Sequence, residues 1–291
     1  MIEINKIDLH IHTNVSDGGS TPKEIIEDAF REGVKAIALT DHDNIGGLKI
    51  ASLAAKENGI QFLNGIEISS LYKNGRIIHI LGIGINPSNK EFLEAYNNMK
   101  RARENGVLNI LNEIKKQGIN ISVDELRKKS FSRYIDRYDI YRYFIRNKIC
   151  NTAQEIWDKY LDIIPYGVGE LMTEDTAISV IKKAGGLSFL AHYNKTIGFG
   201  GLDNFSIEKE IKHLIDLGLD GIERYYPSYK EEDYKFLDYI IEKYKLKISG
   251  GTDYHGKNRP EIKLGGGKQD NLVIPYSVYD NIIKYIKTIE N

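Results

Sequence analysis

Six of the seven histidines in this sequence follow short apolar segments or lie within them. His10 and His12 are two residues apart, and Asp253 and His255 repeat that spacing near the end of the chain. Side chains two residues apart on a strand face the same side, so each pair can approach one ion together. Imidazole and carboxylate groups form a ligand set for Zn, Mn or Fe. One pair alone is weak evidence, because core and surface histidines are common, but the joint pattern predicts a metal cluster.

Further histidines and carboxylates extend this pattern. Glu67 ends the apolar segment 63–66, and a carboxylate in such a place can bridge two metals. His79, taken alone, would be read as a core histidine, and His213 lies in a helical stretch and is predicted to be structural. The predicted metal ligands are His10, His12, Asp17, His42, Glu67, His79, His192, Asp253 and His255.

Short apolar segments alternate with amphipathic segments at both ends of the chain. We expect strands at 7–12, 34–39, 61–66, 77–85, 187–191, 220–223 and 247–250. We expect helices from Thr21 onward, where Pro22 and Glu24 suit a first turn, and at 45–57, 176–183, 207–217 and 230–244. Repeated strand–helix units imply a mostly parallel sheet, either doubly wound or closed as a barrel. In both arrangements functional residues gather at the carboxyl ends of strands, where the predicted ligands fall.

The middle of the chain has helical periodicity and no convincing buried strand. Helices are expected at 91–116, 123–129, 138–146 and 153–160. We therefore divide the chain into an α/β domain formed by residues 1–87 and 163–291 and a helical insert at 88–162 that caps the substrate site.

Composition limits the functions open to the chain. With 291 residues and 41% hydrophobic content it can build a full core, and its formal net charge of -1 argues against binding to duplex nucleic acid. A single cysteine, Cys150, excludes an intramolecular disulfide. The first six residues lack the apolar region of a signal peptide, and no apolar run reaches the roughly 18 residues of a membrane span. We expect a cytoplasmic enzyme that does not bind membranes.

Three arginines are candidates for binding the phosphate of a substrate. The guanidinium group presents a planar fork of donors that matches phosphate. Arg133 and Arg137 lie in an aromatic-rich stretch of the insert, and Arg224 follows the strand expected at 220–223. The alternative is that these arginines are solvated residues of helices or loops.

At these residues the chain resembles the PHP family, named for polymerase and histidinol phosphatase. The matching motifs run in order along almost the whole chain outside the insert. They are Asp8-Leu9-His10-Ile11-His12-Thr13 with Ser16-Asp17-Gly18, Leu39-Thr40-Asp41-His42-Asp43, Gly65-Ile66-Glu67-Ile68-Ser69, His79-Ile80-Leu81-Gly82, Ala191-His192 and Gly251-Thr252-Asp253-Tyr254-His255-Gly256.

The resemblance implies an α/β fold, a distorted (β/α)7 barrel, with two or three divalent metal ions (Mn, Zn or Fe). By the family's pattern, the first metal would be held by His10, His12, Glu67 and Asp253. The second would be held by Glu67, His79 and His192. The third would be held by Asp17, His42 and His255, which are also the residues predicted to be catalytic.

The helical insert is most similar to that of one PHP subgroup, which acts on nucleoside 3′,5′-bisphosphates and on the 5′ ends of short RNA. Three features depart from that subgroup. Tyr193 replaces a proline after the histidine, Asp139 replaces a histidine two residues after Arg137, and a basic residue is missing around 166–169. These departures leave the metal ligands intact and bear on the choice of substrate.

We therefore expect a phosphatase that uses a metal-activated hydroxide on a phosphomonoester of a small phosphorylated substrate, such as a nucleotide or a nucleoside 3′,5′-bisphosphate. The alternative is a 5′-3′ exoribonuclease or phosphodiesterase acting on short single-stranded RNA. A non-catalytic PHP module is a weaker alternative, because such modules usually lose ligands and none of the nine is missing here.

Overall fold

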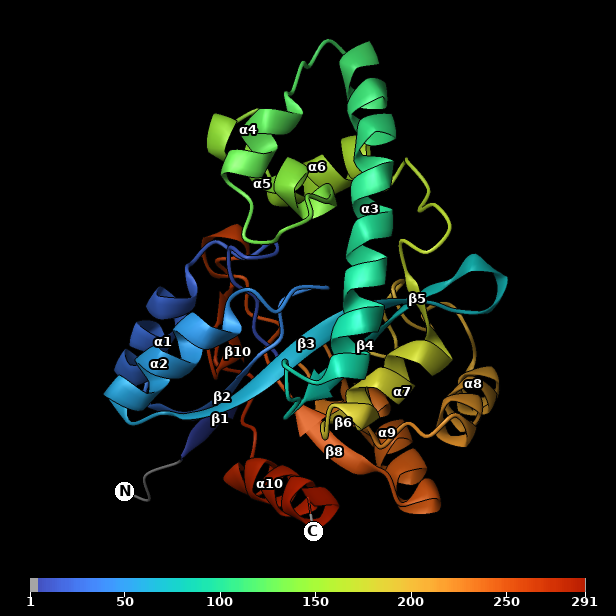
Figure 1. Ribbon diagram of the computed structural model, residues 1–291. Helices are drawn as coiled ribbons and strands as arrows, with labels where there is room; N and C mark the ends of the chain where they lie inside the picture. Colours follow the sequence, from blue (N-terminus) through green and yellow to red (C-terminus); the bar gives the residue numbers. More distant parts are fainter. Residues whose placement is uncertain (1–4, 291) are drawn as a thin grey trace.

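A mixed sheet lies at the centre of the computed structural model, which describes residues 5–290 (Figure 1). Residues 1–4, which include most of the stretch examined for a signal peptide, and residue 291 lie outside the described residues. The strands are β1 (Lys6–Asp8), β2 (Val34–Leu39), β3 (Gln61–Leu71), β4 (Ile77–Ile83), β5 (Met172–Thr173), β6 (Leu187–Leu190), β7 (Gly221–Tyr225) and β8 (Lys247–Gly250). Their order is β1-β2-β3-β4-β6-β7-β8, with β5 beside β3.

Most neighbouring strands of this sheet are parallel, as the sequence predicts. The exception is β4, which runs antiparallel to both β3 and β6. A parallel connection needs a crossover element, whereas only five residues, 72–76, separate β3 from β4. This short connection turns the chain back on itself. A small separate hairpin pairs β9 (Ile262–Lys263) with β10 (Gly267–Lys268).

The helices that flank the sheet agree with the predicted ones. They are α1 (Pro22–Arg31), α2 (Leu48–Asn58), α7 (Glu174–Lys183), α8 (Asn204–Asp216) and α9 (Glu231–Tyr244). Thr21 and Glu24 form the capping box that starts α1, as the sequence predicts. The C-terminal helix α10 (Tyr276–Glu290) was not expected from the sequence.

Side chains from seven strands of the sheet share one apolar cluster with α10. Side chains from β1, β2, β3, β4 and β6 meet Val278, Tyr279 and Ile282 of α10, and Tyr225 of β7 and Ile248 of β8 pack against them. In Figure 1, α10 lies across the end of the sheet opposite to the helical insert. A backbone hydrogen bond also joins the residue that follows β1 to the end of β8, from Leu9 N to Gly250 O over 3.1 Å.

The insert consists of α3 (Lys90–Lys116), α4 (Val123–Lys128), α5 (Arg137–Asn147), α6 (Ala153–Ile156) and a π-helical turn (Trp157–Leu161). The expected helices are confirmed, including the long one, which at 27 residues spans about 40 Å. One end of α3 packs in the main core through Phe92 and Met99. Its other end joins α4, α5 and α6 in a separate apolar cluster. In Figure 1 these three helices lie beside the upper part of α3, above the sheet.

No helix among residues 5–290 is both long and apolar enough to cross a membrane.

Candidate metal centre

The nine predicted ligands are all buried and come from the same end of the sheet. His10 and His12 follow β1, His42 follows β2, His192 follows β6, and Asp253 with His255 follows β8. Glu67 lies within β3 and not at its end, because β3 continues to Leu71 by pairing with β4 and β5. The antiparallel register of β4 places His79 opposite Ser69, two residues beyond Glu67.

The carboxylate of Glu67 is the centre of this cluster. Its Oε2 atom lies 3.2 Å from Nε2 of His10, 3.2 Å from Nε2 of His12 and 3.1 Å from Nδ1 of His42. Its Oε1 atom lies 2.9 Å from Nδ1 of His79 and 3.0 Å from Nε2 of His192. One carboxylate thus faces five imidazoles, which suits a group that bridges metals.

Asp17 forms a second carboxylate centre beside the first. Its Oδ2 atom lies 3.3 Å from Nε2 of His255 and 3.9 Å from Nε2 of His42. The ring of His12 lies between the rings of His42 and His255, with centroids 4.3 Å from each. His12 therefore faces Glu67 through one nitrogen and Asp17 through the other.

The buried polar atoms of this cluster fit bound cations. Nε2 of His10, both ring nitrogens of His12 and Oε2 of Glu67 are buried and make no hydrogen bond in the structure. Such atoms are costly to bury without a partner, and a divalent cation would satisfy them. Three groups have ligand atoms within 4.8 Å of one another: His10, His12, Glu67 and Asp253; His12, Asp17, His42 and His255; and His42, Glu67 and His79.

The first of these groups has the same members as the first ligand set expected from the resemblance. The second contains the third expected set together with His12. His192 stands outside the three groups, although it contacts Glu67. Positive φ angles at His192 (23°) and Asp253 (55°) are unfavourable for residues with a side chain, and such strain often accompanies functional sites.

The surroundings also set the protonation of the cluster. Burial opposes ionisation of Glu67, but the neighbouring histidines outweigh it and hold the pKa of that carboxyl well below its usual value. Burial lowers the pKa of His192 to about 4, which keeps its imidazole neutral and able to bind metal. Burial acts in the same direction on His12, but contacts with Asp253 and Glu67 reverse it and raise the pKa of His12 to about 9.

We expect the affinity for metal to rise with pH up to about 9. Below its pKa of about 9 the metal-free His12 holds a proton, which must leave before its nitrogen can bind an ion. One displaced proton changes the affinity about tenfold per pH unit. A competition titration with a chromophoric chelator between about pH 6 and 9 measures this slope. A constant affinity over that range would contradict the expectation.

The sequence did not single out Glu223, which contacts two of the predicted ligands. This fully buried residue of β7 accepts a hydrogen bond from the backbone N–H of His192 over 2.8 Å, and its Oε1 lies 2.8 Å from Nδ1 of His10. A carboxylate on the far nitrogen of a ligating histidine fixes its tautomer and raises its basicity. The signal was present, because the triplet Gly-Ile-Glu occurs both at 65–67 and at 221–223.

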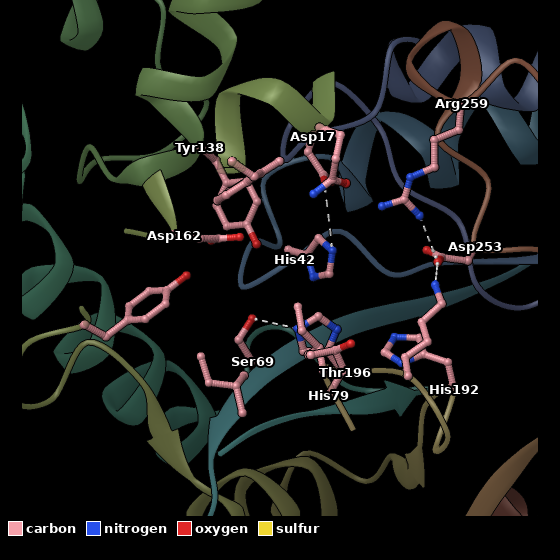
Figure 2. Close-up of a pocket in the computed structure, with 16 residues that line it drawn as sticks. Asp17, His42, Ser69, His79, Tyr138, Asp162, His192, Thr196, Asp253 and Arg259 are labelled. Atoms are coloured by element: carbon pink, nitrogen blue, oxygen red, sulfur yellow. Dashed lines mark hydrogen bonds and ion pairs between the residues drawn. The ribbon is translucent and has the colours of Figure 1, made fainter. Parts of the chain in front are cut away.

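A cavity of about 300 Å³ opens onto this cluster (Figure 2). Five predicted ligands line it, together with Lys195 and Arg259, neither of which was singled out from the sequence. Both cations contact Oδ2 of Asp253, Lys195 over 3.1 Å and Arg259 over 3.0 Å. The insert contributes Tyr138, Gln154, Trp157 and Asp162 to the wall of this cavity, and Tyr166, from the segment directly after the insert, also lines it.

The three arginines predicted to bind substrate are absent from the lining of this cavity. Arg137 is buried and donates hydrogen bonds to the carbonyl oxygens of Leu161 and Pro165. Arg133 is exposed, and Arg224 forms a two-pronged ion pair with Asp238. His213, predicted to be structural, lies in α8 and contacts Glu174.

The chain is similar to known proteins over most of its length. The model of the PHP domain matches residues 8–173 of the chain. A phosphoribosyl 1,2-cyclic phosphate 1,2-diphosphodiesterase from Eggerthella lenta is 29% identical, covering 86% of this chain and 94% of the relative. A 5′-3′ exoribonuclease from Haemophilus influenzae is 30% identical (86% and 90%), and a 3′,5′-nucleoside bisphosphate phosphatase from Chromobacterium violaceum is 29% identical (86% and 87%).

A solved structure has the same fold. It is a protein from Bifidobacterium adolescentis assigned as a metal-dependent phosphoesterase, and it is 25% identical to this chain. The match has a TM-score of 0.81 and covers 97% of this chain and 96% of the other. The fold, the buried histidine–carboxylate groups and these relatives all agree, and the chain therefore belongs to the PHP family of metal-dependent phosphoesterases.

Proposed function

We propose that the protein hydrolyses a phosphate monoester of a nucleotide-sized substrate. One observation carries this proposal: the same cavity of about 300 Å³ is lined both by predicted metal ligands and by aromatic side chains of the insert. A scissile phosphate at the ligands would leave the organic part of the substrate against the insert. The nucleoside bisphosphate phosphatase from C. violaceum, as a relative of similar length, supports the same reading.

Two or three divalent ions of Mn, Zn or Fe fit the buried donor set. When bound, such ions polarise a phosphoryl oxygen and lower the pKa of a water to about 7. Glu67 would bridge two ions, and Glu223 would keep His10 in the correct tautomer. The predicted catalytic residues Asp17 and His42 line the cavity, and His255 lines the adjoining one. The attacking water would give up a proton as it bonds to phosphorus, and the carboxylate of Asp17 would accept that proton and pass it to the leaving oxygen as the phosphate ester bond breaks.

Recognition of phosphate is assigned to Lys195 and Arg259. Both line the main cavity and a second cavity of about 270 Å³, and both contact Oδ2 of Asp253. An arginine beside a metal ligand can still bind a phosphate oxygen, through the guanidinium N–H groups that do not donate to the carboxylate. Arg137 is less suited to this role, because its guanidinium group is already bonded to backbone carbonyls.

The aromatic wall of the cavity favours a substrate that carries a nucleobase. Tyr138, Trp157 and Tyr166 line the cavity from the insert side. Stacking of a base on an aromatic side chain contributes about 1–3 kcal/mol. The insert at 88–162 would then act as a substrate cap over a PHP barrel formed by residues 1–87 and 163–291. The apolar cluster shared by seven strands and the bond from Leu9 N to Gly250 O support closure of the sheet as a distorted (β/α)7 barrel.

A specific observation favours short RNA as the alternative substrate. Cavities of about 270 and 210 Å³ adjoin the main cavity and share Arg259 with it, which leaves room for more than one nucleotide. The exoribonuclease from H. influenzae is a relative of similar length.

Phosphate release by the Mn-loaded protein tests the proposal. The substrates are a 5′-mononucleotide, the corresponding 3′,5′-bisphosphate, ribose 5-phosphate and a 5′-phosphorylated trinucleotide. We expect faster release from the nucleotides than from ribose 5-phosphate, because only the nucleotides have a base to stack. Nucleoside monophosphates appearing without inorganic phosphate would favour the exoribonuclease. Equal rates on ribose 5-phosphate and the nucleotides would contradict recognition of the base.

A further inference from the structure

The loop that carries Asp17 is held from the insert. Three consecutive carbonyl groups of this loop accept hydrogen bonds from side chains of α5. Arg142 Nη1 donates to the oxygen of Val15 over 2.6 Å and to that of Ser16 over 3.1 Å. The hydroxyl of Tyr141 donates to the oxygen of Asp17 itself over 3.2 Å. The backbone on which the Asp17 carboxylate depends is therefore attached to an element more than 120 residues away in the sequence.

The insert also contacts His42, another member of the same group. The ring of Tyr138, in the first turn of α5, stacks on the ring of His42 with centroids 5.6 Å apart and planes 13° from parallel. Next to His42, the carboxylate of Asp43 pairs with Arg103 of α3 over 2.7 Å. Figure 2 shows Tyr138, Asp17 and His42 together on one side of the cavity.

The supporting residues of α5 are themselves fixed by burial and charge. Arg142 is 6% exposed and pairs with the buried carboxylate of Asp139 one turn earlier. Asp139 in turn accepts a hydrogen bond from the backbone N–H of Asp136, which closes the capping box at the start of α5. The acid at position 139 therefore orients Arg142 towards the Asp17 loop.

We propose that α5 is part of the site formed by His12, Asp17, His42 and His255, with Arg142 and Tyr141 as positioning residues for Asp17. The group of His10, His12, Glu67 and Asp253 is instead supported from the sheet, through Glu223. The segment after β8 contacts the Asp17 loop as well, because Asn258 donates a hydrogen bond to the oxygen of Asp17 over 2.6 Å, but none of its described residues donates to the oxygens of Val15 or Ser16, which Arg142 holds. Loss of the α5 contacts should therefore weaken one metal site and spare the other. This inference rests on the proposed function insofar as both need the cluster to bind metal.

The test compares metal binding by two variants with that of the wild-type chain. Tyr141→Phe removes only the hydroxyl, and the double variant Arg142→Met with Asp139→Asn removes the buried cation together with its partner. Tyr143→Phe and Arg146→Met, on the same helix, are the matched controls. Ions per chain are counted by elemental analysis, and affinities are measured by chelator competition. Thermal unfolding of the metal-saturated proteins checks the fold.

We expect the double variant to bind one ion fewer than the wild type at limiting metal, with the affinity of that site reduced about 10- to 100-fold. Tyr141→Phe should cause a smaller shift in the same site, and the controls should bind like the wild type. Asp17→Asn provides the reference, because it removes the ligand itself. Combining it with the double variant should cause no additional loss of metal if both act on one site.

Two results would overturn the inference. Unchanged stoichiometry and affinities in the double variant would mean that the loop holds Asp17 without α5. An equal weakening of every site would mean that α5 stabilises the protein in general and positions no particular ligand. Both readouts are independent of phosphate release, so a failure of the proposed substrate class is distinguishable from a failure of this inference.

Discussion

Glu67→Gln is expected to abolish metal-dependent hydrolysis. Glutamine keeps the size of the side chain but removes the charge that faces five imidazoles, the closest at 2.9 Å. The ions would lose their bridging ligand, and with it the Lewis-acid stabilisation worth several kcal/mol, or roughly a 10³-fold loss in kcat. Metal content and kcat should fall together, which elemental analysis and a phosphate-release assay measure on the same sample.

The control is Asp220→Asn. Asp220 directly precedes β7, at the end of this strand away from the metal cluster, and its carboxylate contacts Ser188 and Lys247. This variant should keep both its metal and its activity. The interpretation of Glu67 as a bridging ligand would be contradicted by a Glu67→Gln protein that binds as many ions as the wild type and turns over at a similar rate.

Arg259→Met is expected to lower kcat/KM by about 10- to 100-fold. A charge-assisted hydrogen bond to an anion contributes about 1.5–3 kcal/mol, and 1.4 kcal/mol corresponds to a factor of ten. Arg259 lines all three cavities at the site, so its loss should lower kcat/KM for every phosphorylated substrate. Steady-state kinetics with a 5′-nucleotide and with its 3′,5′-bisphosphate measure the effect.

Arg259 also pairs with the predicted ligand Asp253, so metal content must be measured in parallel. Full metal content with reduced kcat/KM would identify Arg259 as a substrate-binding residue. Loss of metal would identify it as a support for Asp253. Lys257→Met is the matched control, because Lys257 is an exposed cation of the same loop and should be replaceable without effect.

The helices and strands were largely predictable because their signals are local. The capping box at Thr21 and Glu24, the spacing of apolar residues and the glycine stops mark element ends within a few residues of their observed positions. The helix α10 was not predicted, although its signals are also local: Pro275 precedes its first residue, and Val278, Ile282 and Ile286 recur at helical spacing.

The substrate side of the site was harder to predict. Arg137 and Arg259 have the same chemistry, and their sequence positions do not reveal which of them faces the cavity. In the structure, Arg137 bonds to carbonyls of the segment 161–165, whereas the loop after β8 brings Arg259 to the metal ligands. The difference is one of long-range packing.

The sequence by itself predicted the nine candidate ligands and the edge of the sheet at which they lie. It did not predict that β1 ends at Asp8, before His10 and His12, or that β3 continues beyond Glu67 to Leu71. Spacings of two residues and positions after apolar strands are local properties, and strands of one sheet bring such positions to a common edge.

Only the tertiary structure decided how these groups are supported. Glu223 reaches His10 across 213 residues of sequence, and Arg142 reaches Val15 across 127. Such contacts depend on how β7 and the insert pack against the first strands, because a long side chain takes its partner from its surroundings and not from its neighbours in sequence.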